Sequence, residues 1–465
     1  MSIMKRIIVS VILIFTISLS AFGVDVLTLS EYLEKITEKL PQIRQNLIKE
    51  EMAELNIIKA DSYRDLSLSA GASWNGVNGY SGYDYSNGLS LFAKLKKTLP
   101  ATGAVLSTGI EYDFLSMETN GNNVHRFAPA LTVDVTQPLM KNYLGKLDKI
   151  PLLKSKLASQ IQKLQTDDAL TALRTDFTKL YYRWASLDNA LQLLEKRIEN
   201  ALLMEEEVQR RYRNNLADAD EVYQSHSTVL TYREGYVQTE RGVQQLKKEL
   251  EPYIDLSHAR PDVALFESLW QKAAEYEFVI TPFEETRHYL MLATTLEQAG
   301  LDITLSRELT KPDLNLSAGL TFRTQEEAFS DSYKVDDLDY RVSLTLSFPL
   351  GNRAAKAGLS LSQLDYEYAG LEIVNAALSH QKALGQLSAQ FGGNYRLLEL
   401  RKENLETLRS QYEAQRRKYN QARLELNNLI QTDNQITGEL IQINDLKYNL
   451  IEAYLQYLYL TGQSQ

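Results

Sequence analysis

The sequence predicts a mixed α/β membrane protein in which two similar halves each carry strands followed by a long helical hairpin. Three observations predict it. Apolar and polar residues alternate within 64–139 and 312–350, proline is absent from 152–251 and after residue 349, and segments of the first half recur in the second. Alternation is typical of strands with one apolar face, and long proline-free windows allow long helices.

The composition narrows the function classes. The chain has 465 residues, with 50 Lys+Arg against 60 Asp+Glu, a net charge of -10, 44% hydrophobic residues and no cysteine. These values exclude wholesale disorder, argue against a basic nucleic-acid-binding face, and rule out disulfide scaffolds and cysteine nucleophiles. The five histidines form no His-Glu-x-x-His motif, and Gly-x-Ser-x-Gly and Walker-type loops are absent. We therefore predict no enzyme, no cofactor and no metal site.

The first segment has the features of a secretory signal peptide. Lys5 and Arg6 precede an apolar run over 7–17, and small residues follow at positions 21 and 23. The run is shorter than the ~20 residues that a spanning helix needs, so we expect residues 1–23 to be cleaved and not to form an anchor. No later apolar stretch is long enough to span. The exported chain is then either soluble or crosses a membrane by strands.

The alternating segments predict strands. In 66–74, Leu, Ala and Trp occupy one face while Ser and Gly occupy the other, and 105–114 and 131–136 alternate similarly. A soluble sandwich also alternates, but strands of about 9–12 residues with a Ser/Gly/Thr-rich polar face are the signature of a water-filled outer-membrane barrel. We expect strands at about 64–77, 88–98, 104–116, 128–139, 312–323 and 339–350.

These strands assign side chains to two environments. We expect the apolar set to face lipid: Leu68, Ala70, Trp74, Ile110, Tyr112, Val133, Leu316, Leu344 and Leu346. We expect the polar set to face a lumen: Ser69, Glu111, Asp134, Ser317 and Thr345.

The last proline-free window has a coiled-coil period. Ten residues follow each other at alternating steps of three and four, and eight of them are apolar or aromatic: Leu426, Leu429, Asp433, Ile436, Leu440, Ile443, Lys447, Leu450, Tyr454 and Tyr457. An ordinary amphipathic helix shows a shorter run, so this length favours packing against a long partner helix.

The chain contains an internal duplication. Three pairs of matching segments occur in the same order in both halves, at 65–71 and 313–319, 133–139 and 344–350, and 211–224 and 418–431. Their offsets are 248, 211 and 207, and six of seven residues are identical in the first pair. We divide the chain after the signal into a first repeat over 24–256 and a second over 257–465.

The offsets show where the repeats differ. The first repeat carries 248 − 211 = 37 extra residues between its first and its last strand, enough for one extra hairpin. Its connection near 100–103 is short, and we expect longer connections at 76–88 and 116–127. Alternating short and long connections are typical of outer-membrane barrels.

Taken together, these segments resemble the TolC-like outer-membrane efflux protein family. The resemblance covers the whole mature chain, and its marks are the duplicated halves, the strand exits at 136–139 and 347–353, and two helical tips. The family tip reads roughly Tyr-x-x-Gly-x-x-Ser-x-x-Asp-Leu, and it aligns with 212–222 and 419–429. Each of these two tips departs from the pattern at its Gly and Ser positions.

The departures concern the turns. Asn215 and Ala422 stand where Gly is usual, and Asp218 and Glu425 replace the small hydroxyl residue. Asn tolerates a left-handed conformation and Ala does so poorly, so we expect the second tip to turn differently from the first.

The resemblance implies a homotrimer in the cell outer membrane with a large periplasmic part. Strands from three subunits would close a transmembrane β-barrel in contact with lipid, continuous with a long periplasmic α-helical barrel. The tips would contact a periplasmic adaptor (membrane fusion) protein that links to an inner-membrane pump of unknown class. Four strands per subunit are usual, so the extra hairpin either makes six or projects outside.

The implied function is the exit duct of a tripartite efflux or type I-like secretion system. The alternatives are a passive porin-like outer-membrane channel, which does not need such long helices, and a periplasmic coiled-coil scaffold or adaptor, which does not need amphipathic strands. The exported substrate is not indicated.

The resemblance also implies the site residues. Adaptor contacts fall on the first tip, Arg213, Asn214, Asn215, Leu216, Ala217 and Asp218, and on the second, Asn420, Gln421, Ala422, Arg423 and Glu425. A periplasmic gate falls on Tyr419, Glu221, Asn428 and Gln431. Asn428 and Gln431 occupy positions where family members carry carboxylate rings, so we expect weak cation preference. Asp433, Asp220 and Glu425 are the candidates to replace those carboxylates.

Overall fold

The fold is described from a computed structural model that covers residues 25–78, 85–119, 122–276, 279–332, 337–421 and 423–463. The predicted signal peptide lies outside these residues. The chain forms two compact units. The hairpin unit comprises Met1–Leu40, Arg174–Phe278 and Ser388–Gln456, and the sheet unit comprises Pro41–Leu173, Val279–Leu387 and Tyr457–Gln465. Each unit therefore draws on both sequence repeats.

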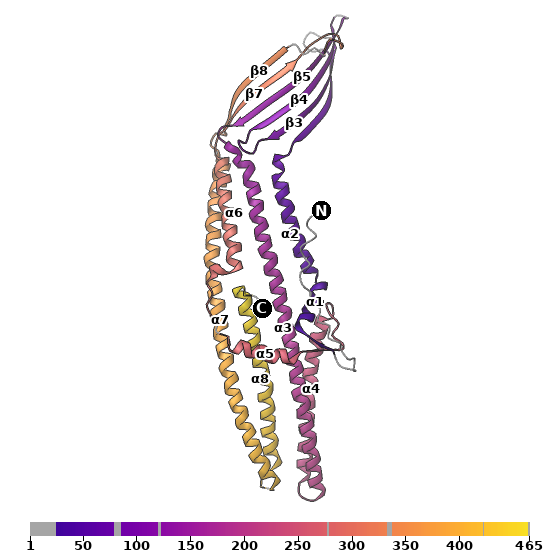
Figure 1. Cartoon of the computed structure of the whole chain (residues 1–465), viewed down its shortest axis with the longest axis vertical. Coiled ribbons are helices and arrows are strands. Elements are labelled where there is room, and N and C mark those ends of the chain that lie inside the picture. Colours follow the sequence, from indigo (N-terminus) through magenta and orange to yellow (C-terminus); the bar gives the residue numbers. More distant parts are fainter. Residues whose placement is uncertain are drawn as a thin grey trace, which may run out of the picture. The chain divides into compact units, whose positions relative to one another are not determined.

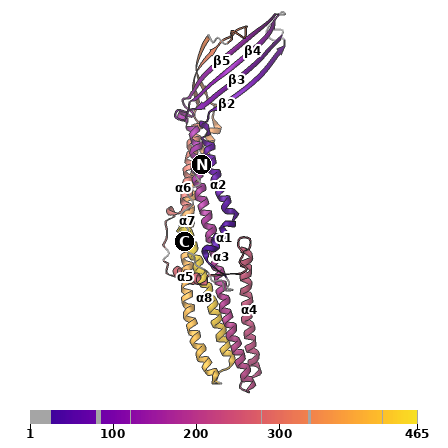
Figure 2. The ribbon, with the colours of Figure 1, turned by 45° about the vertical axis from the view of Figure 1, so that its right-hand side comes forward.

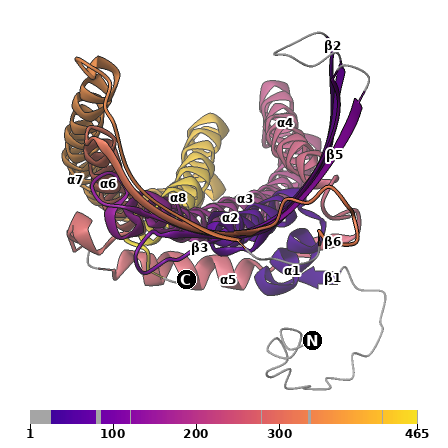
Figure 3. The ribbon, with the colours of Figure 1, turned by 90° about the horizontal axis from the view of Figure 1, so that it is seen from above.

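The sheet unit contains one antiparallel sheet with the strand order β2-β3-β4-β5-β7-β8 (Figure 1). Its strands are β2 (Ser67–Asn78), β3 (Tyr85–Thr98), β4 (Val105–Thr119), β5 (Asn122–Pro138), β7 (Asp313–Arg323) and β8 (Asp337–Ser347). The extra hairpin, β3–β4, lies within the sheet between β2 and β5. Viewed from above, the strands form a curved strip (Figure 3).

One expected connection is largely strand. We expected a long loop at 116–127, but β4 and β5 pair as far as Thr119 and Asn122. Aromatic side chains extend the ladder here, because the ring of Phe114 lies 5.9 Å from that of His125 and 5.0 Å from that of Phe127. The polar residues of this segment had suggested a loop, whereas cross-strand stacking stabilises a ladder.

The register separates the two faces of the sheet. Partners across a ladder point to the same side, and Leu68, Leu95, Thr108, Val133, Leu320 and Tyr340 follow one another across all six strands. By this register the nine residues expected to face lipid share one face, here called the apolar face. The five expected to face a lumen share the other, the polar face.

Charge follows the same division. On the apolar face, the described strand residues carry charge at Lys97 and Glu118, near opposite ends of β3 and β4. The polar face carries ion pairs between strands, including Lys94 with Glu111, and Asp134 with Arg341 at 3.1 Å. The sheet thus has an uncharged band on its apolar face and a charged, polar surface on the other face.

The helices of the sheet unit come from both sequence repeats. They are α2 (Pro41–Asp61), α6 (Arg287–Leu309), and parts of α3 (Lys146–Arg213), α7 (Arg353–Asn420) and α8 (Leu426–Thr461). Short 3₁₀ turns occupy Ser62–Arg64, Tyr143–Gly145 and Phe283–Glu285. Lys154 of α3 pairs with Asp302 of α6 at 2.6 Å, and Ser306 of α6 lies 2.7 Å from Ser362 of α7.

The hairpin unit is mostly helical. It contains β1 (Asp25–Leu27) paired in parallel with β6 (Ala259–Pro261), helices α1 (Leu29–Lys39), α4 (Ala219–Leu250) and α5 (Val263–Ala274), and the remaining parts of α3, α7 and α8. In this unit α4 runs beside α3, and α8 beside α7 (Figure 2). The buried ring of Tyr181 packs on Tyr32 and Trp184, and its hydroxyl donates to the Leu27 carbonyl at 2.7 Å.

The seam of α8 is buried. Leu426 and Leu450 are 0% exposed, and the seam continues to Tyr457. Its two charged members are paired: Asp433 with Arg197 of α3 at 2.9 Å, and Lys447 with Glu267 of α5 at 2.8 Å. Pairing makes these polar positions tolerable in an otherwise apolar seam.

Candidate functional site

The first tip turns through an asparagine in the left-handed conformation. Helix α3 ends at Arg213 and α4 begins at Ala219, and Asn215 between them has φ +56°. The Leu216 amide donates to the Arg211 carbonyl at 2.9 Å and the Asn214 amide to the same carbonyl at 3.1 Å, which closes the end of α3. Asn is suited to this turn because its short polar side chain reduces the left-handed penalty.

The second tip closes with the same bonds. The Arg423 and Gln421 amides both donate to the Lys418 carbonyl, at 2.9 Å and 3.1 Å, and these residues match Leu216, Asn214 and Arg211 at the repeat offset of 207. The expected difference between the tips is therefore not seen in these bonds. Ala422, on which that expectation depended, lies outside the described residues.

Most of the expected tip residues are solvent-exposed. Ala217 is half-buried, and the exposed ones are Arg213, Asn214, Asn215, Leu216, Asp218, Asn420, Gln421, Arg423 and Glu425. Leu216 is 66% exposed, an apolar side chain on an otherwise polar turn. The tips thus offer charges of both signs, amides and one leucine to a partner.

The structure brings together two of the four expected gate residues. The Tyr419 hydroxyl donates to Glu221 Oε2 at 3.4 Å, and the Arg211 guanidinium lies 4.1 Å from the centre of the Tyr419 ring. Tyr419 is 3% exposed and packs with Val208 and Leu426. Burial, with the Glu221 carboxylate close by, raises the pKa of Tyr419 to about 12. The hydroxyl therefore stays protonated at physiological pH and can donate this bond.

The other two residues expected at the gate lie on a different side of α8. Asn428 and Gln431 are exposed, whereas Leu429 and Ile430 are buried in the cluster around Tyr419. Asp220 and Glu425 are exposed as well. Asp433 is not: it is 5% exposed and paired, which removes it from the candidates for an exposed carboxylate ring.

Asp433 instead joins three helices. It accepts from Arg197 of α3 at 2.9 Å and from the Tyr232 hydroxyl of α4 at 2.6 Å, and Thr437 donates to Tyr232 at 3.4 Å. Burial and the Asp433 charge raise the pKa of Tyr232. One signal for this cluster is visible in the sequence, an aspartate within an apolar seam, but no local pattern identifies Arg197 or Tyr232 as its partners.

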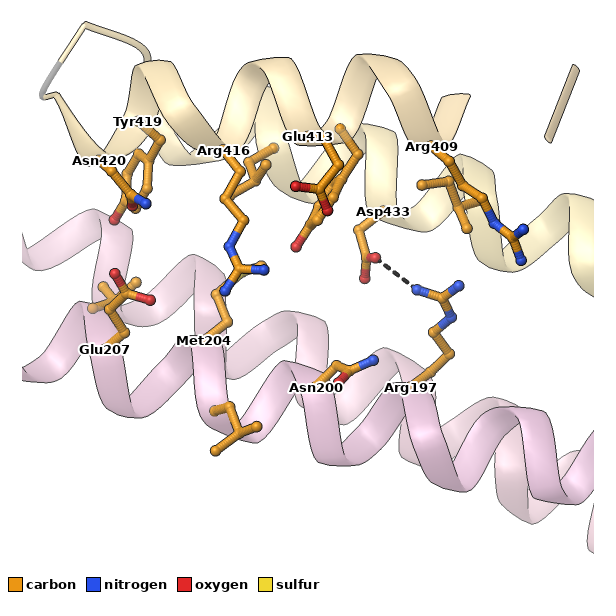
Figure 4. Close-up of a pocket in the computed structure, with 15 residues that line it drawn as sticks. Arg197, Asn200, Met204, Glu207, Arg409, Glu413, Arg416, Tyr419, Asn420 and Asp433 are labelled. Carbon is orange, nitrogen blue, oxygen red and sulfur yellow. Dashed lines mark hydrogen bonds and ion pairs between the residues drawn. The ribbon is translucent and has the colours of Figure 1, made fainter. Parts of the chain in front are cut away.

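A cavity of about 530 Å³ lies between α3, α7 and α8 in the hairpin unit (Figure 4). Its wall carries both charge signs, with Arg197, Arg409 and Arg416 against Glu207, Glu413 and Asp433. Tyr419 and Asn420 line the end near the second tip, and the Arg416 side chain extends from α7 towards Met204 of α3 (Figure 4). Such a mixed polar wall suits hydrated space between helices.

Two kinds of feature are absent from the described residues. In that part of the chain, no three His, Asp or Glu side chains come together as a metal site would require. No helix there is both long and apolar enough to cross a membrane.

No protein-family model matches this chain. No curated protein matches it in sequence. Solved structures do match, and they share one architecture: this chain has the fold of bacterial outer-membrane channel proteins. The mixed α/β fold predicted from the sequence, and the TolC-like resemblance at the level of fold, are thereby confirmed.

The particular matches are distant in sequence. CusC, described in terms of transmembrane channel formation, aligns at 12% identity and TM-score 0.68 over 93% of this chain and 91% of its own. The outer membrane protein VceC of Vibrio cholerae aligns at 12% and 0.67 over 93% and 96%. The outer-membrane channel OprN aligns at 11% and 0.66 over 94% and 90%.

Proposed function

We propose that this protein is the outer-membrane exit duct of a tripartite efflux or type I-like secretion system. It acts as a homotrimer, located in the outer membrane with a large periplasmic part. Substrates reach it from an inner-membrane pump through a periplasmic adaptor. The duct itself catalyses no reaction, because its task is to supply a continuous aqueous path.

One observation carries the proposal. A single chain combines two helices of 68 residues each, α3 and α7, with a sheet whose apolar face has an uncharged central band. At about 1.5 Å per residue, such a helix is about 100 Å long. The sheet suits a bilayer, and helices of this length suit the span of a periplasm. A passive porin has no use for the helices, and a soluble scaffold has no use for the sheet face.

The tips are the proposed adaptor contacts. Arg213 and Arg423 are exposed, and they belong to turns whose closing bonds use only backbone atoms. Replacing both by Glu reverses two charges per subunit without removing a described ion pair. We expect export to be lost while the protein still fractionates with the outer membrane as a heat-sensitive trimer.

The controls separate the alternatives. The control is Arg417→Glu, which reverses the charge of an exposed residue of α7 that precedes the second tip. This variant should leave export unchanged. Unchanged export in the Arg213→Glu, Arg423→Glu variant would contradict docking at the tips. A purified trimer that conducts freely without any adaptor would favour the porin, and recovery of the full chain in the soluble periplasmic fraction would favour the scaffold.

A further inference from the structure

We infer that the extra hairpin, β3–β4, forms part of the barrel wall, and that β8 of one copy pairs with β2 of the next in a register set by the internal repeat. With the three copies of the proposed function, on which this inference rests, the barrel has 3 × 6 = 18 strands. It is wider than a barrel built from four strands per copy.

The first argument is the continuity of the sheet through the hairpin. β2 pairs with β3, β3 with β4, and β4 with β5, each along its described length. The turn at the end of the hairpin is also fixed: Gln137 of β5 donates to the Thr102 carbonyl at 2.9 Å. Gly103 has φ +72°, and a Cβ there would lie 2.5 Å from the Gly145 amide nitrogen. A hairpin held in this way is an integral part of the sheet.

The second argument is the continuity of the apolar face. On that face β4 presents Leu106, Thr108, Ile110, Tyr112, Phe114 and Ser116, six uncharged side chains spread over eleven residues of the strand. A transmembrane strand needs about 9–11 residues. A hairpin that projected into water would gain nothing from such a band. The hairpin strands thus match the bilayer as the other strands do.

The third argument is that both edges of the sheet lack a partner strand within the described chain. Trp74 of β2 is 64% exposed, and Val342 and Leu344 of β8 are 70% and 64% exposed. In a bilayer, unpaired backbone groups at a sheet edge cost several kcal/mol each, so the edges must pair. Because the six strands alternate in direction, β8 of one copy meets β2 of another copy in antiparallel orientation.

The register follows from the repeat. Within one copy, the last strand of the first half, β5, pairs with β7, the first strand that the second half contributes to this sheet. The equivalent step between copies joins β8 to β2. Thr321 pairs with Thr132. The offset of 248 relates Thr321 of β7 to Ser73 of β2, and the offset of 211 relates Thr132 of β5 to Ser343 of β8. Ser73 of one copy is therefore expected opposite Ser343 of the next.

Other pairs obtained in the same way keep the faces matched. Phe322 with Leu131 becomes Trp74 with Val342, and both pairs lie on the apolar face. The Thr136 and Ser317 hydroxyls, 3.0 Å apart inside the copy, become Ser347 and Ser69 on the polar face. A shift by one residue would place every apolar side chain of one edge against the polar side chains of the other.

Cysteine cross-linking tests the register, and the cysteine-free chain gives a clean background. Directly opposite residues in an antiparallel ladder have Cα atoms about 4.5–5.5 Å apart, within disulfide range, whereas diagonal neighbours are too distant. We expect oxidised Ser73→Cys, Ser343→Cys trimers to give covalent dimers and trimers, and nothing larger, on non-reducing gels. The off-register control Ser73→Cys, Thr345→Cys should stay monomeric after denaturation.

A second pair tests the position of the hairpin. If β3–β4 lay outside the barrel, β2 would pair with β5 as β7 pairs with β8. Ser317 of β7 pairs with Ser343 of β8, and the offsets of 248 and 211 relate these residues to Ser69 of β2 and Thr132 of β5. Ser69 would then lie opposite Thr132. In the sheet these two residues are three strands apart, about 14 Å. We expect no cross-link in Ser69→Cys, Thr132→Cys, and efficient linking in Ser69→Cys, Lys94→Cys, which are direct partners.

The outcomes distinguish this inference from the proposed function. An intact trimer in which Ser69→Cys links to Thr132→Cys, or in which only the Ser73–Thr345 pair links, overturns the inference and leaves the duct in place. Failure to recover any trimer from the membrane overturns the duct. Electron microscopy of the trimer gives an independent measure, because eighteen strands make a barrel about 1.5 times as wide as twelve.

Discussion

The sheet of the sheet unit and the α8 seam of the hairpin unit place their ion pairs in opposite ways. In the sheet, Asp134 and Arg341 form an ion pair whose side chains are 32% and 74% exposed, on the face opposite to the apolar side chains. In the hairpin unit, Asp433 and Arg197 are 7% and 17% exposed, between packed helices. This pair is enclosed between helices, whereas the sheet pair is accessible to water on the face opposite to the apolar side chains.

This difference shows what each unit needs from outside. The seam of α8 is covered by other helices of the same chain, so its polar members had to find partners within that chain. Much of the apolar face of the sheet is not covered, since Leu316, Leu344 and Leu346 are 40%, 64% and 65% exposed. Such a face requires an external apolar phase, which a bilayer supplies.

The largest effect is expected where a buried charge loses its partner. Asp433→Asn leaves Arg197 enclosed without a counter-charge, which costs about 3–5 kcal/mol of unfolding free energy. The matched control is Asp445→Asn, because Asp445 is on the same helix and pairs with an arginine of α3, Arg183, at 3.7 Å with both side chains substantially exposed. That loss should be at most about 1 kcal/mol. Equal shifts in the thermal unfolding of the two purified variants would contradict the comparison.

The second prediction concerns the faces of the sheet. Leu344→Arg introduces a charge on the apolar face, which at mid-membrane costs roughly 2–4 kcal/mol, whereas its neighbour Thr345→Arg points to the polar face and costs far less. We expect low trimer yield for the first variant and near-normal yield for the second, measured by semi-native electrophoresis of outer membranes. Equal yields would contradict the assignment of the apolar face to lipid.

The same contrast explains how far the sequence could predict the fold. The strands and their faces follow from a local period of two, which Leu68, Ala70 and Trp74 show within seven residues. The ends of β4 and β5 did not follow, because stacking of Phe114 on His125 depends on two strands together. Local periodicity carries no information on such cross-strand pairs.

The candidate site shows the same limit more strongly. Arg197 and Asp433 are 236 positions apart, so the charge in the seam was visible in the sequence and its partner was not. The contact between Tyr419 and Glu221 came from the family resemblance alone. The same resemblance placed Asp433 among the candidates for an exposed carboxylate ring, and only the packing of α8 against α3 and α4 showed it to be buried.

A smaller effect is expected at Tyr419. Its bond to Glu221 is long, at 3.4 Å, so Tyr419→Phe should cost only about 0.5–1.5 kcal/mol and make the closed state easier to open in single-channel recordings. The pKa is raised in the folded protein, so the tyrosine contributes stability fully below about pH 10 and loses it as the pH rises to about 12. The phenylalanine variant should lack this alkaline loss, and an identical loss in both would assign it to other groups.

The smallest effect is expected for cation block. Asn428 and Gln431 are exposed and uncharged, and Asp433, one of the three carboxylates that could replace them, is buried and paired. Three-fold symmetry would triple any charge placed at these positions, and closely spaced carboxylates attract multivalent cations. We therefore expect little block of the purified trimer by a trivalent cation added from the periplasmic side. The Asn428→Asp, Gln431→Glu variant adds six carboxylates per trimer and should convert this weak response into high-affinity block. Strong block of the unmodified trimer would show that Asp220 or Glu425 already forms a ring. An unresponsive double variant would mean that Asn428 and Gln431 do not line the narrow part of the channel.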